Sequence, residues 1–553
     1  MTPSNSDTMN CMNIKNQIKN SLEEASGIEN PEIVFSSNDQ FGDYSSNIAL
    51  RNKDLDTQKI ADEINSKNLP FSAKVVGRFI NFFIKTDVLV DNLMQIDGNF
   101  GRSTVLNGKK IMFEFAHPNT HKAFHIGHLR NITTGETLSR LYEAVGANVV
   151  RANYQGDVGL HIAKALYGIE LDGFDDPNDI KKRAEFLGQV YAKGATAFEE
   201  SDNAKARVNE INKLIYDKSD SKVNELYKKT RQWSLDYFSE IYKRVYTKFD
   251  RYYFESETFE LGKETALKAL KDGILKESEG AIIFEGSKHG LHDRVFISGK
   301  GVPTYEAKDL GLAKLQFKEY DPDMLVHTVG PEQIGYFQVI FKALELIFPP
   351  SKGKELHVPY GWVRLKEGKM SSRTGNVILG EKILDDAKEN ILTNYKNVDE
   401  KTAEMIAVGA VKYSFLKQGL GQDIAFDLKE SISLEGNSGP YIQYTIARAN
   451  SVLSKSKTIA LQGSTLQYNG EELTILRSLV KFPEIIENSA LNYSPNILCT
   501  YLYDLAQKFN SFYNKHKIIG SDQEEFRLKL TSGVGQVLTT GLNLLGINAP
   551  EKM

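Results

Sequence analysis

The sequence predicts a multidomain α/β protein, with a parallel-sheet domain between a small N-terminal α/β domain and an all-α C-terminal domain. Strand-like and helix-like segments alternate over residues 110–154 with the short connections typical of a parallel sheet. A helical pattern with mixed charge over residues 175–253 interrupts the sheet and indicates an insertion. From residue 385 the apolar spacing is helical almost to the end.

Residues 1–105 are expected to form the N-terminal domain. Ile14–Ser26 and Asp56–Ser66 have the apolar spacing of amphipathic helices, and Ala73–Lys85 alternates in the manner of strands. Gly101–Asn107 is expected to link this domain to the next one.

Residues 106–395 are expected to form the central domain, with its insertion at about 170–300, and residues 396–553 the helical domain. Gly146 marks the end of the first helix of the central domain. The expected elements are strands at Lys110–Phe115, Asn148–Tyr154, Met324–Thr328 and His357–Val363, strand-like pieces within Glu255–Val302, and a helix from about Gly127 to Val145.

Composition excludes several classes of protein. The chain has 553 residues and a formal net charge of −4, which argues against a non-specific nucleic-acid coat but not against recognition of one folded RNA. Its two cysteines, Cys11 and Cys499, make neither a disulfide framework nor a zinc site, so a cytoplasmic protein is expected. No apolar run is long enough for a membrane span, and residues 1–13 lack the pattern of a secretory or transit signal.

The segment EFAHPNTHKAFHIGH, residues 114–128, holds four of the ten histidines. On one continuous helix, their spacing would place them on one face and favour a metal site. Pro118 and Gly127 disfavour that helix, and no cysteine is near. We therefore expect no protein-bound metal, zinc included.

The alternative places this segment in the loop that leaves a parallel strand, with Gly127 at the start of the next helix. Ligands of open α/β sheets bind at the carboxyl ends of strands, and a helix N-terminus attracts phosphate. His-Ile-Gly-His, residues 125–128, is the HIGH signature with which class I aminoacyl-tRNA synthetases and related nucleotidyl transferases hold ATP. His125, Gly127 and His128 are the expected ATP contacts, and both histidines are candidate catalytic residues.

The segment KMSSRTG, residues 369–375, resembles the KMSKS loop that completes the same active site. In isolation a solvated basic turn would be the simpler interpretation, but the HIGH segment lies upstream with a sheet between them. The resemblance implies that Lys369 is catalytic and that ATP is bound by Lys369, Met370, Ser371 and Ser372.

Ser372 stands where most families have a second lysine. Loss of this cation would weaken the stabilisation of charge that develops on the phosphates. Our hypothesis is that Lys122, just ahead of HIGH, supplies the missing cation with help from Arg373.

Further segments, in the same order along the chain, resemble arginyl-tRNA synthetases over nearly the whole length. This resemblance implies a Rossmann-like catalytic domain, an N-terminal additional domain that contacts tRNA, with Phe41–Asn47 as its candidate loop, and a helical anticodon-binding domain. His117 departs from the family pattern, which has a small residue there. The resembling segments are residues 41–47, 77–83, 114–119, 153–157, 303–309, 330–333, 437–448 and 546–553.

The resemblance implies an arginine pocket whose chemistry suits the substrate. A guanidinium presents five donors and stays charged, so a selective pocket needs a carboxylate and further acceptors. Asp309 and Tyr305 would hold the guanidinium, and their spacing places both on one helical face. Considered alone, an aspartate such as Asp309 is more often a residue on the exposed face of a helix. The rest of the site would be lined by Glu114, Asn119, His125 and Gln333.

The implied function is ATP-dependent activation of L-arginine and transfer to the 3′ end of tRNA-Arg, with Mg²⁺ carried on ATP, by a monomer. Tyr441, Tyr444 and Arg448 suit stacking on unpaired bases, or alternatively helix packing. Rival functions are a glutamyl or cysteinyl synthetase, a small nucleotidyl transferase, and a non-catalytic RNA-binding relative. The presence of only two cysteines disfavours the cysteinyl enzyme, and a carboxylate rather than a cation at position 309 disfavours the glutamyl enzyme. The helical C-terminal third is unexplained by a small nucleotidyl transferase, and the presence of both signatures disfavours a non-catalytic relative.

Overall fold

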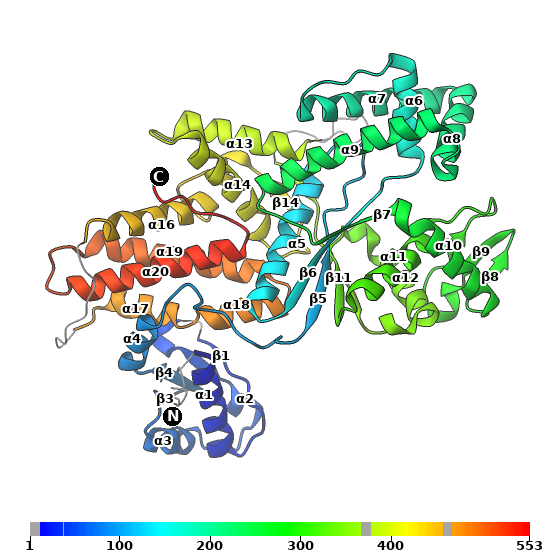
Figure 1. Cartoon of the computed structure of the whole chain (residues 1–553). Coiled ribbons are helices and arrows are strands. Elements are labelled where there is room, and N and C mark those ends of the chain that lie inside the picture. Colours follow the sequence, from blue (N-terminus) through cyan, green and yellow to red (C-terminus); the bar gives the residue numbers. More distant parts are fainter. Residues whose placement is uncertain (1–10, 37, 367–377, 457–466) are drawn as a thin grey trace, which may run out of the picture.

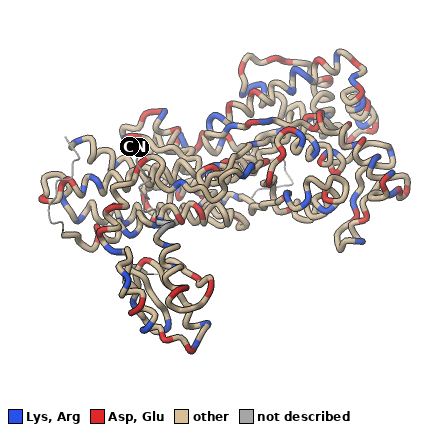
Figure 2. Tube along the Cα trace, turned by 60° about the horizontal axis from the view of Figure 1, so that its bottom comes forward, with Lys and Arg blue, Asp and Glu red and all other residues tan. Residues whose placement is uncertain are grey.

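The computed structural model describes residues 11–36, 38–366, 378–456 and 467–553. The molecule has a long body made of the central sheet, its insertions and the C-terminal helices, from which the N-terminal domain projects (Figure 1). The predicted multidomain α/β class is confirmed. Lys, Arg, Asp and Glu are interspersed along every part of the trace, in keeping with the small net charge (Figure 2).

The N-terminal domain is a four-stranded antiparallel sheet, in the order β1-β2-β4-β3, packed against helices α1 and α3. The Asp56 side chain caps α3 by accepting a hydrogen bond from the Lys59 N–H at 3.0 Å. Both helices and both longer strands agree with the sequence prediction. The elements are α1 (Cys11–Ser26), β1 (Val34–Phe35), β2 (Tyr44–Ser46), α2 (Ile48–Arg51), α3 (Thr57–Ser66), β3 (Phe71–Val76), β4 (Phe79–Ile84) and α4 (Thr86–Met94).

The central sheet has five parallel strands in the order β12-β11-β5-β6-β7. The middle strand β5 is joined to β6 through helix α5, as its βαβ pattern predicted. The carboxyl ends of β5 and β11 meet at one edge, where Glu114 pairs in register with His327. The elements are β5 (Lys110–Glu114), α5 (Ile126–Ala144), β6 (Asn148–Gln155), β7 (Arg251–Phe254), β11 (Met324–His327), α12 (Ile334–Ile347) and β12 (Glu355–His357).

Two excursions leave this sheet. Helices α6–α9 lie between β6 and β7, and a second unit with the antiparallel sheet β10-β9-β8 lies between β7 and β11. The elements are α6 (Leu160–Asp172), α7 (Ile180–Glu200), α8 (Asp202–Asp217), α9 (Ser221–Arg244), α10 (Glu255–Lys271), β8 (Lys276–Ser278), β9 (Ala281–Phe284), β10 (Arg294–Ile297) and α11 (Tyr305–Tyr320).

The strand prediction for residues 255–302 is wrong over its first part, which is helix α10. This helix packs against α11 so closely that a Cβ on Gly262 would lie 2.0 Å from the Ala307 carbonyl oxygen. Apart from Glu255 its buried residues are the small Thr258, Gly262, Thr265, Ala266 and Ala269, so no large apolar residue marks its buried face. The predicted strand at 357–363 is also wrong, because Pro359 and Gly361 separate β12 from β13.

The C-terminal part is helical, as predicted, apart from the short strand β14, which pairs with β13 in parallel. Among the described residues, no helix is both long and apolar enough to cross a membrane. The elements are β13 (Val363–Leu365), α13 (Gly380–Asn394), α14 (Glu400–Leu416), β14 (Ile424–Phe426), α15 (Leu428–Ser431), α16 (Gly439–Leu453), α17 (Gly470–Leu479), α18 (Phe482–Leu491), α19 (Pro495–Lys515) and α20 (Glu524–Leu544).

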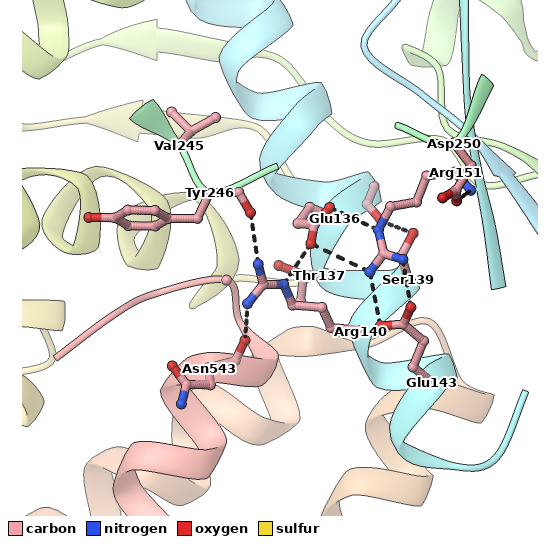
Figure 3. Close-up of polar contacts among 12 residues, drawn as sticks. Glu136, Thr137, Ser139, Arg140, Glu143, Arg151, Val245, Tyr246, Asp250 and Asn543 are labelled. Carbon is pink, nitrogen blue, oxygen red and sulfur yellow. Dashed lines mark hydrogen bonds and ion pairs between the residues drawn. The ribbon is translucent and has the colours of Figure 1, made fainter. Parts of the chain in front are cut away.

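Polar contacts join the far half of α5 to the C-terminal helices (Figure 3). The Arg140 guanidinium donates to the carbonyl oxygens of Tyr246 at 2.7 Å and Asn543 at 2.8 Å. Glu136 accepts from Arg140 at 2.6 Å and from the buried Arg151 at 3.1 Å. One helix of the central domain is thereby fixed to α20 and to the end of α9.

A buried lysine on α14 makes a second connection to the segments that follow α9 and α20. The Lys412 ammonium, on α14, donates to the carbonyl oxygens of Val245 at 2.8 Å and Gly546 at 2.7 Å. Burial lowers the pKa of Lys412 to about 7. We expect Lys412→Met to lower the free energy of unfolding by about 2–4 kcal/mol, because two buried carbonyls lose their donor. Thermal unfolding should show a midpoint several degrees lower, whereas Lys401→Met, an exposed change on the same helix, should match the wild type.

Candidate active site

The HIGH residues form the beginning of α5, as predicted. His125 is the N-cap residue: its Nδ1 accepts from the Gly127 N–H at 3.1 Å, and the Nδ1 of His128 accepts from the His125 N–H at 3.2 Å. The two rings stack with centroids 3.8 Å apart. Burial lowers the pKa of both histidines, with nearby cationic groups contributing. Both rings are therefore neutral at pH 7 with their protons on Nε2, and these N–H groups remain to donate to a ligand.

The loop between β5 and this helix has a strained backbone. Ala116, His117 and His121 have φ of 84°, 52° and 62°, in the left-handed region. His121 is held by α9, with its Nε2 2.8 Å from the Thr230 hydroxyl. The alternative of four histidines on one helix face is therefore wrong. Among the described residues there is no cluster of histidine, cysteine or carboxylate groups that could hold a metal ion.

The loop meets the carboxyl end of β6 at Gly156. A Cβ at this position would lie 2.1 Å from the Asn119 side-chain oxygen, and the Thr120 N–H donates to the Gly156 carbonyl at 3.0 Å. Glycine at position 156 thus leaves room for the Asn119 side chain in its present position. The structure thus joins two of the segments singled out in the sequence, 114–128 and 153–157, at one edge of the sheet.

The KMSKS-like residues Lys369, Met370, Ser371 and Ser372, with Arg373, lie outside the described residues. The described chain resumes at Ile378 against the HIGH segment: the Ile126 N–H donates to the Ile378 carbonyl at 3.0 Å, and the Gly380 N–H donates to the Phe124 carbonyl at 2.9 Å. His125 and Leu379 form an antiparallel bridge. The segment after residue 377 is therefore attached directly to the beginning of α5.

Lys122 lies beside the HIGH residues, on the wall of a cavity of about 660 Å³ between the loop, α7, α9 and α13. Its ammonium is 5.8 Å from the centre of the Tyr191 ring and forms no salt bridge with a described residue. Burial and the nearby Lys164 lower the pKa of Lys122, and Glu255 acts in the opposite direction. A half-buried cation that has no salt-bridge partner among the described residues is an electrostatically suitable place for a phosphate.

A second cavity, of about 420 Å³, lies at the carboxyl ends of β5 and β11 under α11 and α12. Four of the six predicted arginine contacts line it, namely Glu114, Tyr305, Asp309 and Gln333. The other two do not: Asn119 lies against Gly156, and His125 caps α5.

Asp309 lies on the α11 wall of this cavity, one turn after the exposed Tyr305, as their spacing predicted. The Tyr336 hydroxyl of α12 donates to Asp309 Oδ2 at 2.6 Å. Burial raises the pKa of Asp309 to about 7, although the Tyr336 hydrogen bond lowers it. The Asp309 carboxylate is thus costly to ionise alone, and a cationic ligand would favour its ionised form.

Several polar groups of the cavity were missed in the sequence. His327, Glu355, Gln316 and Arg294 all line it. The position of His327 at the end of a buried strand could have revealed it, because that strand neighbours β5. Four buried atoms of residues that line the cavity have no hydrogen-bond partner among the described residues and so suit a polar ligand or water: His117 Nε2, Arg294 Nε, Gln316 Oε1 and Glu355 Oε1.

The predicted RNA-contacting residues lie together on α16, half-buried. The Arg448 guanidinium is 4.9 Å from the centres of the Tyr444 and Tyr513 rings and donates to Asn510 Oδ1 at 2.6 Å. The Tyr441 hydroxyl accepts from the Asn510 amide at 3.0 Å. These side chains therefore pack against α19, and part of each remains accessible.

Comparison with known protein families settles the assignment. The family model for the class I (R) tRNA synthetase catalytic domain matches residues 89–428, that for the arginyl-tRNA synthetase N-terminal domain matches residues 12–84, and that for the DALR anticodon-binding domain matches residues 442–553. The chain belongs to the arginyl-tRNA synthetase family. It is therefore an aminoacyl-tRNA synthetase, a ligase.

Individual relatives of this synthetase agree. The arginine–tRNA ligase of Borrelia hermsii is 33% identical over 92% of this chain and 91% of its own, and that of Treponema denticola is 32% identical over 89% and 88%. Arginyl-tRNA synthetase from Thermus thermophilus matches the fold with a TM-score of 0.82 at 23% identity, over 98% of this chain and 100% of its own. The enzyme from Plasmodium falciparum has a TM-score of 0.79 at 23% identity, over 99% and 100%.

Proposed function

We propose that this synthetase binds the arginine that it attaches to tRNA-Arg in the cavity between Glu114 and Asp309. Arginine carries two cations, and the cavity presents a carboxylate from β5 and another from α11. Asp309, with Tyr305, holds the guanidinium, and Glu114 holds the α-ammonium group, with Gln333 on the same wall. The observation that carries this proposal is the half-buried Asp309 carboxylate, which lines the cavity and forms no salt bridge with a described residue.

The α-carboxylate of arginine must then face the beginning of α5, because the HIGH loop and the cavity share β5. We place the ATP phosphates at the Nε2–H groups of His125 and His128, with Gly127 allowing close approach and Lys122 beside them. Asn119 and His125 lie between the two ligands. By the resemblance of residues 369–375 to the KMSKS loop, Lys369, Met370, Ser371 and Ser372 would contact the nucleotide.

The reaction follows from this arrangement. The arginine carboxylate attacks the α-phosphate, arginyl-adenylate forms and pyrophosphate leaves; the terminal ribose hydroxyl of the tRNA then takes the arginyl group. Positioning and neutralisation of charge suffice for the first step, so no catalytic base is assigned. Mg²⁺ would be carried by phosphate oxygens and water. This fits the walls of the phosphate-side cavity, where Glu381 and Asp385 are already paired with Lys181 or Arg244.

Two surfaces suit the tRNA. On the N-terminal domain a hollow of about 250 Å³ is lined by Phe41, Phe79 and the buried Asn81, a combination that stacks on an unpaired base and reads its edge. Tyr441, Tyr444 and Arg448 offer the same chemistry on the helical domain. We propose that residues 1–105 and 396–553 bind the tRNA around a catalytic domain of residues 106–395, in a monomer that works in the cytoplasm.

Arginine-dependent ATP–pyrophosphate exchange tests the reaction. We expect exchange with arginine only when tRNA-Arg is present, at a rate at least about a hundredfold above that with lysine or citrulline. Citrulline brings no cation to Asp309, and lysine lacks the planar fork of donors that a guanidinium offers, so polar groups of the cavity would be left unpaired. The tRNA requirement rests on the resemblance to the family. Exchange with arginine in the absence of tRNA would contradict that requirement alone, whereas no exchange with any amino acid would contradict the proposed activity.

A further inference from the structure

Glu114, the carboxylate that we propose binds the α-ammonium group of arginine, is part of a buried chain of three charged side chains. His327 Nδ1 is 3.1 Å from Glu114 Oε1, and His327 Nε2 is 2.7 Å from Glu355 Oε2. All three side chains are at most 9% exposed. Gln316, on α11, donates to the other oxygen of Glu114.

The sheet itself brings these groups together. Glu114 ends β5, His327 ends β11 and the two are paired in register, so their side chains lie on the same face. Glu355 begins β12 and pairs with Leu325, two residues before His327, which places it on that face as well. The three adjacent parallel strands β5, β11 and β12 therefore supply one member each.

The ring of His327 is fixed from the other side by α12. Its centre is 5.0 Å from that of Phe337 and 5.5 Å from that of Phe341. With both ring nitrogens bonded and two phenylalanine rings of α12 beside it, the His327 ring is held in the orientation that its contacts with Glu114 and Glu355 set.

We infer that His327, anchored by Glu355, is the positioning residue that aims the Glu114 carboxylate at the α-ammonium group of arginine. This inference rests on the proposed role of Glu114. Each carboxylate oxygen has two lone-pair directions, so Glu114 can accept from His327 and Gln316 and still accept from the ammonium group. In this arrangement Glu355 orients the imidazole of His327, and the imidazole in turn orients the Glu114 carboxylate.

The charges agree with this role. Burial alone would lower the pKa of His327, but Glu114 and Glu355 raise it to about 10. Burial acts to raise the pKa of Glu114, but His327, with His117 and Gln316, outweighs it, so that the pKa is lowered. A protonated His327 thus keeps Glu114 ionised inside the protein, ready for a cation.

Two replacements of His327 separate its two hydrogen bonds. The side-chain amide nitrogen of asparagine reaches the position of Nδ1, and that of glutamine reaches the position of Nε2. His327→Asn therefore keeps the donor to Glu114, whereas His327→Gln keeps only the donor to Glu355. Both variants are neutral, so loss of the positive charge is common to them.

The measurement is the KM for arginine in aminoacylation, with ATP and tRNA saturating. We expect this KM to be at least about tenfold higher for His327→Gln than for His327→Asn, the effect of one hydrogen bond to a charged group. The KM for ATP should differ between the two by less than about twofold. Thermal unfolding midpoints should be alike, because each variant loses one buried bond.

Glu114→Gln separates this inference from the proposed function. If Glu114→Gln leaves the KM for arginine unchanged, the proposed role of Glu114 is wrong. If it raises that KM at least about tenfold while His327→Gln and His327→Asn are equal, only the positioning role of His327 is overturned. Should His327→Gln fail to fold, Glu355→Gln, which releases the anchor, must raise the KM for arginine at least about threefold with little change in the KM for ATP.

Discussion

Asp309→Ala should abolish arginine activation for practical purposes, with kcat/KM for arginine lower by about 10²–10⁴-fold. The guanidinium would enter a cavity without its counter-charge, and breaking a buried ion pair from one side costs about 3–5 kcal/mol. ATP binding should survive, because the HIGH residues lie on another element. The test is pyrophosphate exchange with tRNA-Arg present, beside a direct measurement of ATP binding. Arginine turnover near the wild-type rate would remove Asp309 from the site.

The same carboxylate should give arginine binding a pH dependence. The pKa of Asp309 is raised to about 7 by burial, so below pH 7 the free enzyme holds a neutral acid that must lose its proton to pair with the guanidinium. The KM for arginine should therefore fall about tenfold per unit as pH rises towards 7 and level off above it.

A matched variant checks the source of this dependence. Tyr336→Phe removes the hydroxyl that donates to Asp309 at 2.6 Å, a bond that lowers the pKa of Asp309. The midpoint of the profile should move to higher pH in this variant and disappear in Asp309→Asn, which cannot titrate. An unchanged midpoint in both variants would show that another group titrates.

The parts of the site that the sequence predicted are local in the chain. The HIGH residues could be placed because the strand before them, the glycine within them and the helix after them are adjacent, and Tyr305 and Asp309 because they are one helical turn apart. The surroundings of Glu114 could not be placed in this way. Its partners His327 and Gln316 come from a strand and a helix far along the chain, and only the order of strands in the sheet makes them neighbours.

The fold shows the same division. The parallel sheet and the helical C-terminal part follow from the spacing of large apolar residues, which is visible in the sequence. Helix α10 was mistaken for strands because its packing depends on Gly262 and on small residues around it, which give no apolar periodicity. The role of Lys412 could not be predicted either, because the two carbonyl groups to which it donates come from distant parts of the chain.

Lys122→Ala should lower kcat for arginine activation by about 10²–10³-fold, the usual loss when one fixed donor to a developing charge is removed. The reason is that Ser372 replaces the second lysine of the KMSKS pattern, whereas Lys122 lies beside His125 and forms no salt bridge with a described residue. Lys122→Arg should retain part of the rate. Single-turnover formation of arginyl-adenylate is the measurement that isolates this step.

Lys164→Ala is the matched control for Lys122→Ala. Lys164 is a neighbouring cation that is already paired with Glu199, at 3.4 Å, and it does not line the cavity of Lys122. Its loss removes the same local charge but no phosphate contact, so kcat should change less than about threefold. Because Lys164 lowers the pKa of Lys122, its removal should, if anything, favour the charged form of Lys122. If Lys122→Ala forms arginyl-adenylate as fast as Lys164→Ala, the hypothesis for Lys122 is wrong. Arg373 would then be the remaining candidate for the missing positive charge.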